Sequence, residues 1–120
     1  MTLHATLADE IVSRFGEHLD GAPRIGQDAL TLHFQNGLVL QARFASPEEY
    51  SIQWRAGDTE QRIDTAPLHP ELASFPHHRH AADGTAGPDN LTQPGRAPLE
   101  NLSAVIAAIL SDPQPQSGQN

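Results

Sequence analysis

Four histidines stand close together in the second half of this chain, flanked by two arginines and one aspartate. Imidazole, carboxylate and guanidinium groups held together can transfer protons and stabilise developing negative charge. Any chemistry that the chain performs is therefore expected at this cluster. The candidate site residues are Arg62, Asp64, His69, His77, His78, Arg79 and His80.

One chemistry that suits these groups is cleavage of a phosphodiester. One imidazole takes a proton from the attacking hydroxyl and another gives a proton to the leaving oxygen, and an unperturbed imidazole pKa of about 6.5 suits both tasks. RNA supplies its own nucleophile in the 2′-hydroxyl, so the reaction needs no metal. In this interpretation His77 and His80 share the proton transfers, His69 or His78 assists, Asp64 orients an imidazole, and Arg62 and Arg79 hold phosphate.

Two other interpretations stay open. His69, His77 and His80 could bind zinc or another divalent ion together with Asp64, as in a metal-dependent hydrolase, although their spacing matches no standard site. The cluster could instead be a non-enzymatic binding loop, or a polar loop that faces water. Residues two apart on one strand face, such as Arg62 and Asp64, also form ordinary exposed ion pairs.

Charge and composition limit the class of protein. The 120 residues carry a formal net charge of −8 and include no lysine or cysteine. Passive coating of nucleic acid through its phosphates is disfavoured at this charge, although a local cationic site remains compatible with it. The lack of cysteine excludes disulfides and thiolate chemistry. No apolar run approaches the roughly 20 residues of a membrane span and no signal peptide is recognisable, so we expect a cytoplasmic protein.

Helical spacing of apolar residues marks both ends of the chain. Residues 1–20 are predicted to form an amphipathic helix that ends near Gly21, with His4 and His18 at its surface. A second helix is predicted to begin at Pro98 and to end before Pro113. The apolar positions are Leu3, Leu7, Ile11, Phe15 and Leu19 in the first helix and Leu99, Leu102, Ile106, Ile109 and Leu110 in the second.

Between these helices the apolar residues alternate with a period of two, which predicts strands. Residues 29–44 form a hairpin in which a three-residue loop, with a left-handed Gly37, keeps Leu32 beside Leu40 on one face. His33 then points away from the core. Further strands are predicted at 50–55 and 60–65, and the second of these has Arg62 and Asp64 on one face and Ile63 on the other.

The elements together predict an α+β fold. It consists of an N-terminal helix, a four-stranded antiparallel β-meander, a histidine-rich loop and a C-terminal helix, with both helices on one face of the sheet. Residues 81–98 are rich in Gly and Pro and are interpreted as a surface excursion. We expect one domain over residues 1–112 and a disordered tail at 113–120, because the tail has no apolar residue to bury.

The motif segments resemble the TumE family of bacterial toxins. Members of that family carry a strand ending in Arg-Tyr-Asp-Asn-Ala-Pro-His-His-Pro, then Phe-Pro-His-His-Lys-His, then a short C-terminal helix. The motifs span about a fifth of the chain, and Arg79 is a like-charged replacement. The matching positions are Arg62, Asp64, Ala66, Pro67, His69, Pro70, Phe75, Pro76, His77, His78 and His80.

Three positions depart from the family pattern: Ile63 replaces a tyrosine, Thr65 an asparagine and Leu68 a histidine. Any role that the family gives to these positions is lost or altered here. The resemblance implies the toxin of a type II toxin–antitoxin system, paired with a helix-turn-helix antitoxin. RNA cleavage is a hypothesis that extends this resemblance from the residue chemistry, and an acidic surface would suit a basic face on the antitoxin.

Overall fold

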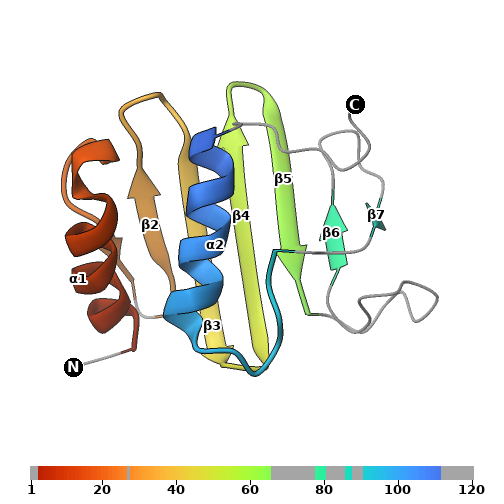
Figure 1. Cartoon of the computed structure of the whole chain (residues 1–120). Coiled ribbons are helices and arrows are strands. Elements are labelled where there is room, and N and C mark those ends of the chain that lie inside the picture. Colours follow the sequence, from red (N-terminus) through yellow and green to blue (C-terminus); the bar gives the residue numbers. More distant parts are fainter. Residues whose placement is uncertain (1–2, 27, 66–77, 81–85, 88–90, 112–120) are drawn as a thin grey trace.

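The computed structural model describes residues 3–26, 28–65, 78–80, 86–87 and 91–111, and for 78–80 and 86–87 it describes the backbone alone. Two helices cover one face of an antiparallel sheet, so the predicted α+β class is confirmed (Figure 1). The helices are α1 (Leu3–Phe15) and α2 (Pro98–Ser111), and a 3₁₀ turn, η1 (Gly16–His18), follows α1. The predicted tail at 113–120 lies outside the described residues.

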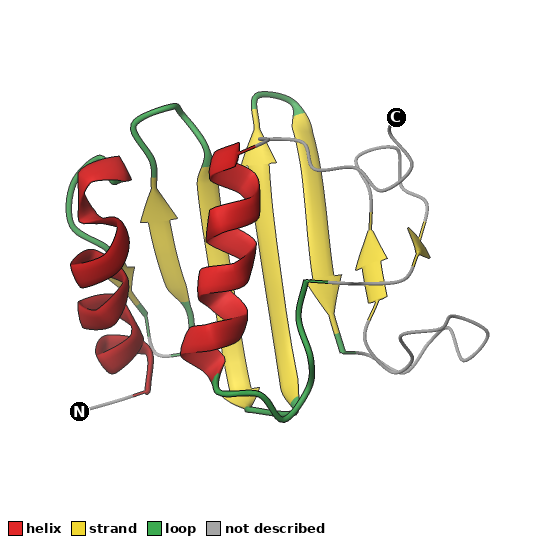
Figure 2. Ribbon diagram, viewed as in Figure 1, coloured by secondary structure: helices red, strands yellow, loops and turns green. Residues whose placement is uncertain are grey.

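The sheet is wider than the predicted four-stranded meander. Its seven described strands are hydrogen-bonded in sequence order (Figure 2). The four predicted strands form the centre, and short strands extend the sheet at both edges. The bounds are β1 (Arg24–Ile25), β2 (Leu30–His33), β3 (Val39–Ser46), β4 (Glu49–Ala56), β5 (Thr59–Asp64), β6 (His78–His80) and β7 (Ala86–Gly87).

The hairpin between β2 and β3 has the predicted register. Leu32 pairs with Leu40, and the N–H of Phe34 donates to the carbonyl of Leu38 over 2.9 Å. Gly37 has φ +92°, a left-handed conformation that glycine adopts without steric cost. The side chain of Asn36 accepts the N–H of Leu38 and closes the loop. The three-residue turn therefore keeps the apolar side of both strands on the core face.

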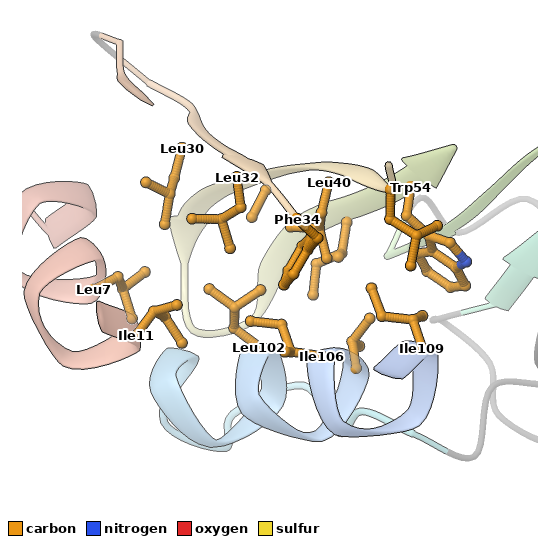
Figure 3. Close-up of a cluster of buried hydrophobic side chains, with 14 of the residues drawn as sticks. Leu7, Ile11, Leu30, Leu32, Phe34, Leu40, Trp54, Leu102, Ile106 and Ile109 are labelled. Atoms are coloured by element: carbon orange, nitrogen blue, oxygen red, sulfur yellow. The ribbon is translucent and has the colours of Figure 1, made fainter. Parts of the chain in front are cut away.

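The core lies between the helices and the sheet. Figure 3 shows the helix side chains facing apolar side chains from the sheet. Figure 1 shows α2 crossing the centre of the sheet and α1 at the edge formed by β1 and β2. The facing residues labelled in Figure 3 are Leu7, Ile11, Leu102, Ile106 and Ile109 from the helices and Leu30, Leu32, Phe34, Leu40 and Trp54 from the sheet.

The first helix differs from its prediction in length and in its buried face. It ends at Phe15, and Leu3 is 40% exposed whereas His4 is 5% exposed. Residues spaced by four drift around a helix of 3.6 residues per turn, so a line of leucines every four positions leaves the core face within two turns. The prediction that His4 lies at the surface was wrong, whereas His18 is exposed as expected.

His4 is buried because it completes the sheet. Its Nε2 accepts the backbone N–H of Phe44 over 3.1 Å. Phe44 lies beyond the last pair between β2 and β3, Leu30 with Ala42, and next to the irregularity of register between Phe44 and Ser46. A side chain from α1 therefore satisfies a backbone donor that β2 does not reach.

One described part of the predicted surface excursion, residues 91–97, is tied to the fold instead. Thr92 is 4% exposed and its hydroxyl lies 2.6 Å from that of Tyr50. The fully buried amide of Asn101 accepts the N–H of Gln93 and donates to its carbonyl, both over 3.0 Å. These polar contacts connect the chain before α2 to the start of β4 and to α2 itself.

Candidate active site at the edge of the sheet

Strand β5 carries the first two candidate residues and separates them from the core. Ile63 is fully buried and Gln61 is 2% exposed, and both lie on the face that the helices cover. Arg62 and Asp64 occupy the alternate positions and therefore lie on the opposite face. The predicted division of this strand into an apolar and a charged face is confirmed.

Arg62 and Asp64 form a direct ion pair on this open face. Nε of Arg62 lies 2.9 Å from Oδ2 of Asp64, and the side chains are 45% and 14% exposed. A charge-assisted hydrogen bond of this length orients both groups. The guanidinium remains half-accessible, and its remaining N–H donors can contact an anion at the surface.

The pairing of β6 with β5 brings part of the histidine cluster beside that ion pair. His80 pairs with Arg62 and His78 pairs with Asp64 in an antiparallel register. Residues directly opposite each other in an antiparallel pair lie on the same face of a sheet. Positions 62, 64, 78 and 80 therefore share the open face, and the segment predicted as a loop contains a strand at 78–80.

The other candidate residues are not brought together by the described structure. The register sets Arg79 opposite Ile63, at a position on the other face from Arg62. His69 and His77 lie outside the described residues. Because the proposed metal ligands include both of them, the described part of the chain leaves that set incomplete, and within that part no group of three His, Asp or Glu residues is arranged to hold a metal ion.

Two departures from the family pattern have structural explanations here. Ile63 is a core residue and does not share the face of Arg62 and Asp64. The hydroxyl of Thr65 accepts the N–H of Tyr50 over 3.1 Å and lies 3.3 Å from its carbonyl oxygen, and the backbone N–H of Thr65 donates to the same carbonyl over 3.2 Å. Thr65 thereby fixes the chain as it leaves β5. The third departure, Leu68, lies outside the described residues.

The open face also carries a hollow that the sequence analysis missed. It has a volume of about 130 Å³ and is lined by Thr31, Val39, Gln41, Gln53, Trp54, Arg55 and Glu60. Gln53 pairs across the strands with Arg62, so the hollow adjoins the ion pair. Alternation along β5 places Glu60 on the face of Arg62 and Asp64, but the other lining residues come from three more strands, so no local pattern marks the hollow.

The open face differs in charge from the molecule as a whole. Four of the seven arginines, Arg24, Arg43, Arg55 and Arg62, stand on it with the carboxylates of Glu60 and Asp64, and Arg43 also contacts Asp28. The whole chain has a net charge of −8. The described charges on this face nearly balance, so it is less acidic than the chain as a whole.

Comparison with known proteins agrees with the motif. A family model described as Toxin TumE matches residues 4–113. No curated protein and no solved structure matches the chain. The match covers α2, every described strand and all of α1 except Leu3. In the part of the chain that the structure describes, neither helix is long and apolar enough to cross a bilayer.

Proposed function

Because this chain belongs to the TumE toxin family, we propose that it is the toxin of a type II toxin–antitoxin pair and that it cleaves RNA. The observation that carries the chemical part of this proposal is the register of β5 and β6, which sets His80 opposite Arg62 and His78 opposite Asp64. The positions of two histidines, one arginine and one aspartate then share one face of a sheet, and these residue types are the set that metal-independent phosphodiester cleavage uses.

The reaction begins with the 2′-hydroxyl of the RNA. An imidazole removes its proton, and the oxygen attacks the adjacent phosphorus. The bond from phosphorus to the 5′-oxygen breaks, and a second imidazole protonates that oxygen. The products are a 2′,3′-cyclic phosphate and a 5′-hydroxyl, so atoms and protons balance without water or metal.

The residues have distinct roles in this proposal. The half-exposed guanidinium of Arg62 holds the phosphate, since negative charge grows on its oxygens in the transition state. Asp64 is 14% exposed and orients an imidazole by accepting its N–H. His80 and His77 share the two proton transfers, one as the base and the other as the acid, with His69 or His78 assisting. One imidazole must be neutral and one protonated, so the rate is expected to peak between two titrations.

The toxin role implies a protein partner. We infer an antitoxin of the helix-turn-helix class that presents a basic face to this acidic chain, because complementary charge speeds association and favours the correct partner. Association of the pair should weaken as salt is raised.

A cleavage assay on labelled RNA tests the chemical proposal. Wild-type protein should cleave with and without a chelator, and His80→Ala and His77→Ala should each lose at least about 100-fold in rate. His18→Ala is the matched control, because that histidine is exposed and lies in η1, outside the proposed site. Cleavage abolished by the chelator would favour a metal-dependent hydrolase with Asp64, His69, His77 and His80 as ligands. No cleavage in any condition would favour a non-enzymatic interaction module.

Expression in bacteria separates toxicity from chemistry. Induced wild-type protein should arrest growth. Expression of the neighbouring antitoxin gene should restore growth. Growth arrest that persists in His80→Ala but disappears in a variant that does not fold would show that toxicity does not depend on cleavage.

A further inference from the structure

Two side chains of opposite charge line the hollow on the open face without forming an ion pair with each other. Arg55 and Glu60 are directly opposite in the register of β4 and β5, where opposite charges normally pair. No ion pair of 4 Å or less joins them among the described contacts. Glu60 instead accepts the side-chain amide of Gln53 over 2.9 Å through Oε2. A carboxylate oxygen and a guanidinium are thus both left facing the hollow.

The remaining wall of the hollow carries both hydrogen-bond donors and hydrogen-bond acceptors. Gln41 donates to the Thr31 hydroxyl over 3.5 Å, and its carbonyl oxygen accepts from Arg43 over 3.3 Å. These side chains are tied to one another and so keep their orientation. An enclosed apolar cavity of about 150 Å³ binds benzene. The hollow of about 130 Å³ is smaller but open to solvent, so one edge of a planar base can enter it while the rest of the base stays outside.

From this geometry we propose that the hollow is a subsite for a guanine base of RNA. Guanine is the one RNA base with two adjacent donors on its Watson–Crick edge, N1–H and N2–H₂, which match the carboxylate of Glu60. Its O6 and N7 atoms accept hydrogen bonds, and a guanidinium such as that of Arg55 is their commonest partner in proteins. Unpaired RNA bases are generally read on these edges.

The position of the hollow connects this subsite to the proposed chemistry. Gln53 is opposite Arg62, and Glu60 lies two residues before Arg62 on the same face of β5, a separation of about 7 Å. One nucleotide can span that distance with its base in the hollow and its phosphate at Arg62. The inference rests on the proposed function for its substrate class, and it adds cleavage next to guanosine.

Binding of mononucleotides to the full chain tests the subsite without requiring cleavage. Guanosine 3′-monophosphate is titrated into ¹⁵N-labelled protein, and the side-chain amide signals of Gln41 and Gln53 are followed. These signals should shift, and binding should be at least tenfold weaker for the adenosine, cytidine, uridine and inosine 3′-monophosphates. Inosine lacks only the N2 amino group, so it isolates one of the two donors to Glu60.

Variants make the test specific. Glu60→Gln should weaken guanosine 3′-monophosphate binding at least tenfold, because the amide nitrogen turns a donor toward the base donors. Glu10→Gln makes the same chemical change on the exposed side of α1 and should bind as wild type does. Equal binding of all five nucleotides, or no shift at the two glutamines, would overturn the guanine subsite.

The failure of this inference is distinguishable from that of the proposed function. RNA cleavage without preference for guanosine would overturn the subsite and leave the ribonuclease intact. Guanosine-selective binding to a protein that cleaves no RNA would support the subsite and overturn the ribonuclease. Shifts of both glutamines caused by the antitoxin, with none caused by nucleotides, would assign the hollow to the protein partner and overturn the subsite.

Discussion

The two faces of the central sheet are built from the same strands but do different work. On the covered face, residues such as Ile52 and Ile63 are fully buried against a layer of two helices. On the open face, their strand neighbours Gln53 and Arg62 are partly exposed and hydrogen-bonded or charged. Alternation along each strand is what separates them.

The contrast teaches that stability and chemistry are divided between the faces. Burial of apolar area is the main source of stability, and almost all of it lies on the covered face. Exposed polar pairs contribute little to stability, so the residues of the open face are free to be selected for binding and reaction. Substitutions on the two faces should therefore change different observables.

The largest loss of stability is expected for Ile63→Ala. The side chain is fully buried, so its truncation should lower the free energy of unfolding by about 2–5 kcal/mol. Urea unfolding followed by far-ultraviolet circular dichroism measures the loss. Ile63→Val should cost only about 0.5–1.5 kcal/mol. A loss below about 1 kcal/mol for Ile63→Ala would mean that the covered face does not supply the stability.

The next prediction concerns the adjacent residue on the other face. Asp64→Asn keeps the shape of the side chain and should change the free energy of unfolding by less than about 1 kcal/mol, since the partner guanidinium of Arg62 is 45% exposed and Asn keeps an oxygen that can accept its hydrogen bond. The cleavage rate should fall about 100-fold, which corresponds to about 2.7 kcal/mol of transition-state free energy. If the free energy of unfolding falls as far as it does in Ile63→Ala, stability and chemistry are not divided between the two faces.

A smaller effect is expected where the covered face uses a polar group. His4→Leu removes the acceptor of the Phe44 N–H and should cost about 1–3 kcal/mol, because a buried donor is left unsatisfied. The measurement is the urea midpoint, with His18→Leu as the exposed control. His4→Gln offers an amide oxygen as acceptor and should recover part of the loss. Equal midpoints for the His4 and His18 variants would contradict the role assigned to His4.

The smallest effect is expected for an open-face ion pair away from β5 and β6. Arg43 contacts Asp28 over 3.2 Å, with side chains 51% and 82% exposed. Arg43→Ala should change the free energy of unfolding by less than about 0.5 kcal/mol, because water screens the pair. Thermal unfolding at low and high salt checks this. A loss above about 2 kcal/mol would show that the open face also carries stability.

Much of the fold follows from the spacing of apolar residues. Alternation at Leu30, Leu32 and Leu40 fixed both the hairpin register and the length of its turn, because a shift by one residue reverses the faces of a strand. Pro98 begins the second helix as expected, since its missing N–H costs nothing there. The charged face of β5 followed from the same alternation.

The errors occur where hydrogen bonds rather than apolar contacts decide the structure. Strand β6 has no apolar alternation, and it forms by pairing its backbone with the edge of β5. Its sequence therefore resembles a loop. His4 lies in a helix whose leucine spacing predicted a different buried face. Thr92 lies among residues typical of turns, although it is buried. Partners distant in sequence determine all three, and local patterns do not contain them.

In the proposed function, residues at β5 and β6 cleave RNA, with one histidine accepting a proton from the 2′-hydroxyl and another donating a proton to the 5′-oxygen. Phosphorus NMR of the products from a short RNA tests it most directly, with chelator present throughout. The account predicts a 2′,3′-cyclic phosphate from wild type and from His18→Ala, and almost none from His80→Ala. Products that carry a 5′-phosphate, or equal amounts of cyclic phosphate from wild type and His80→Ala, would contradict it.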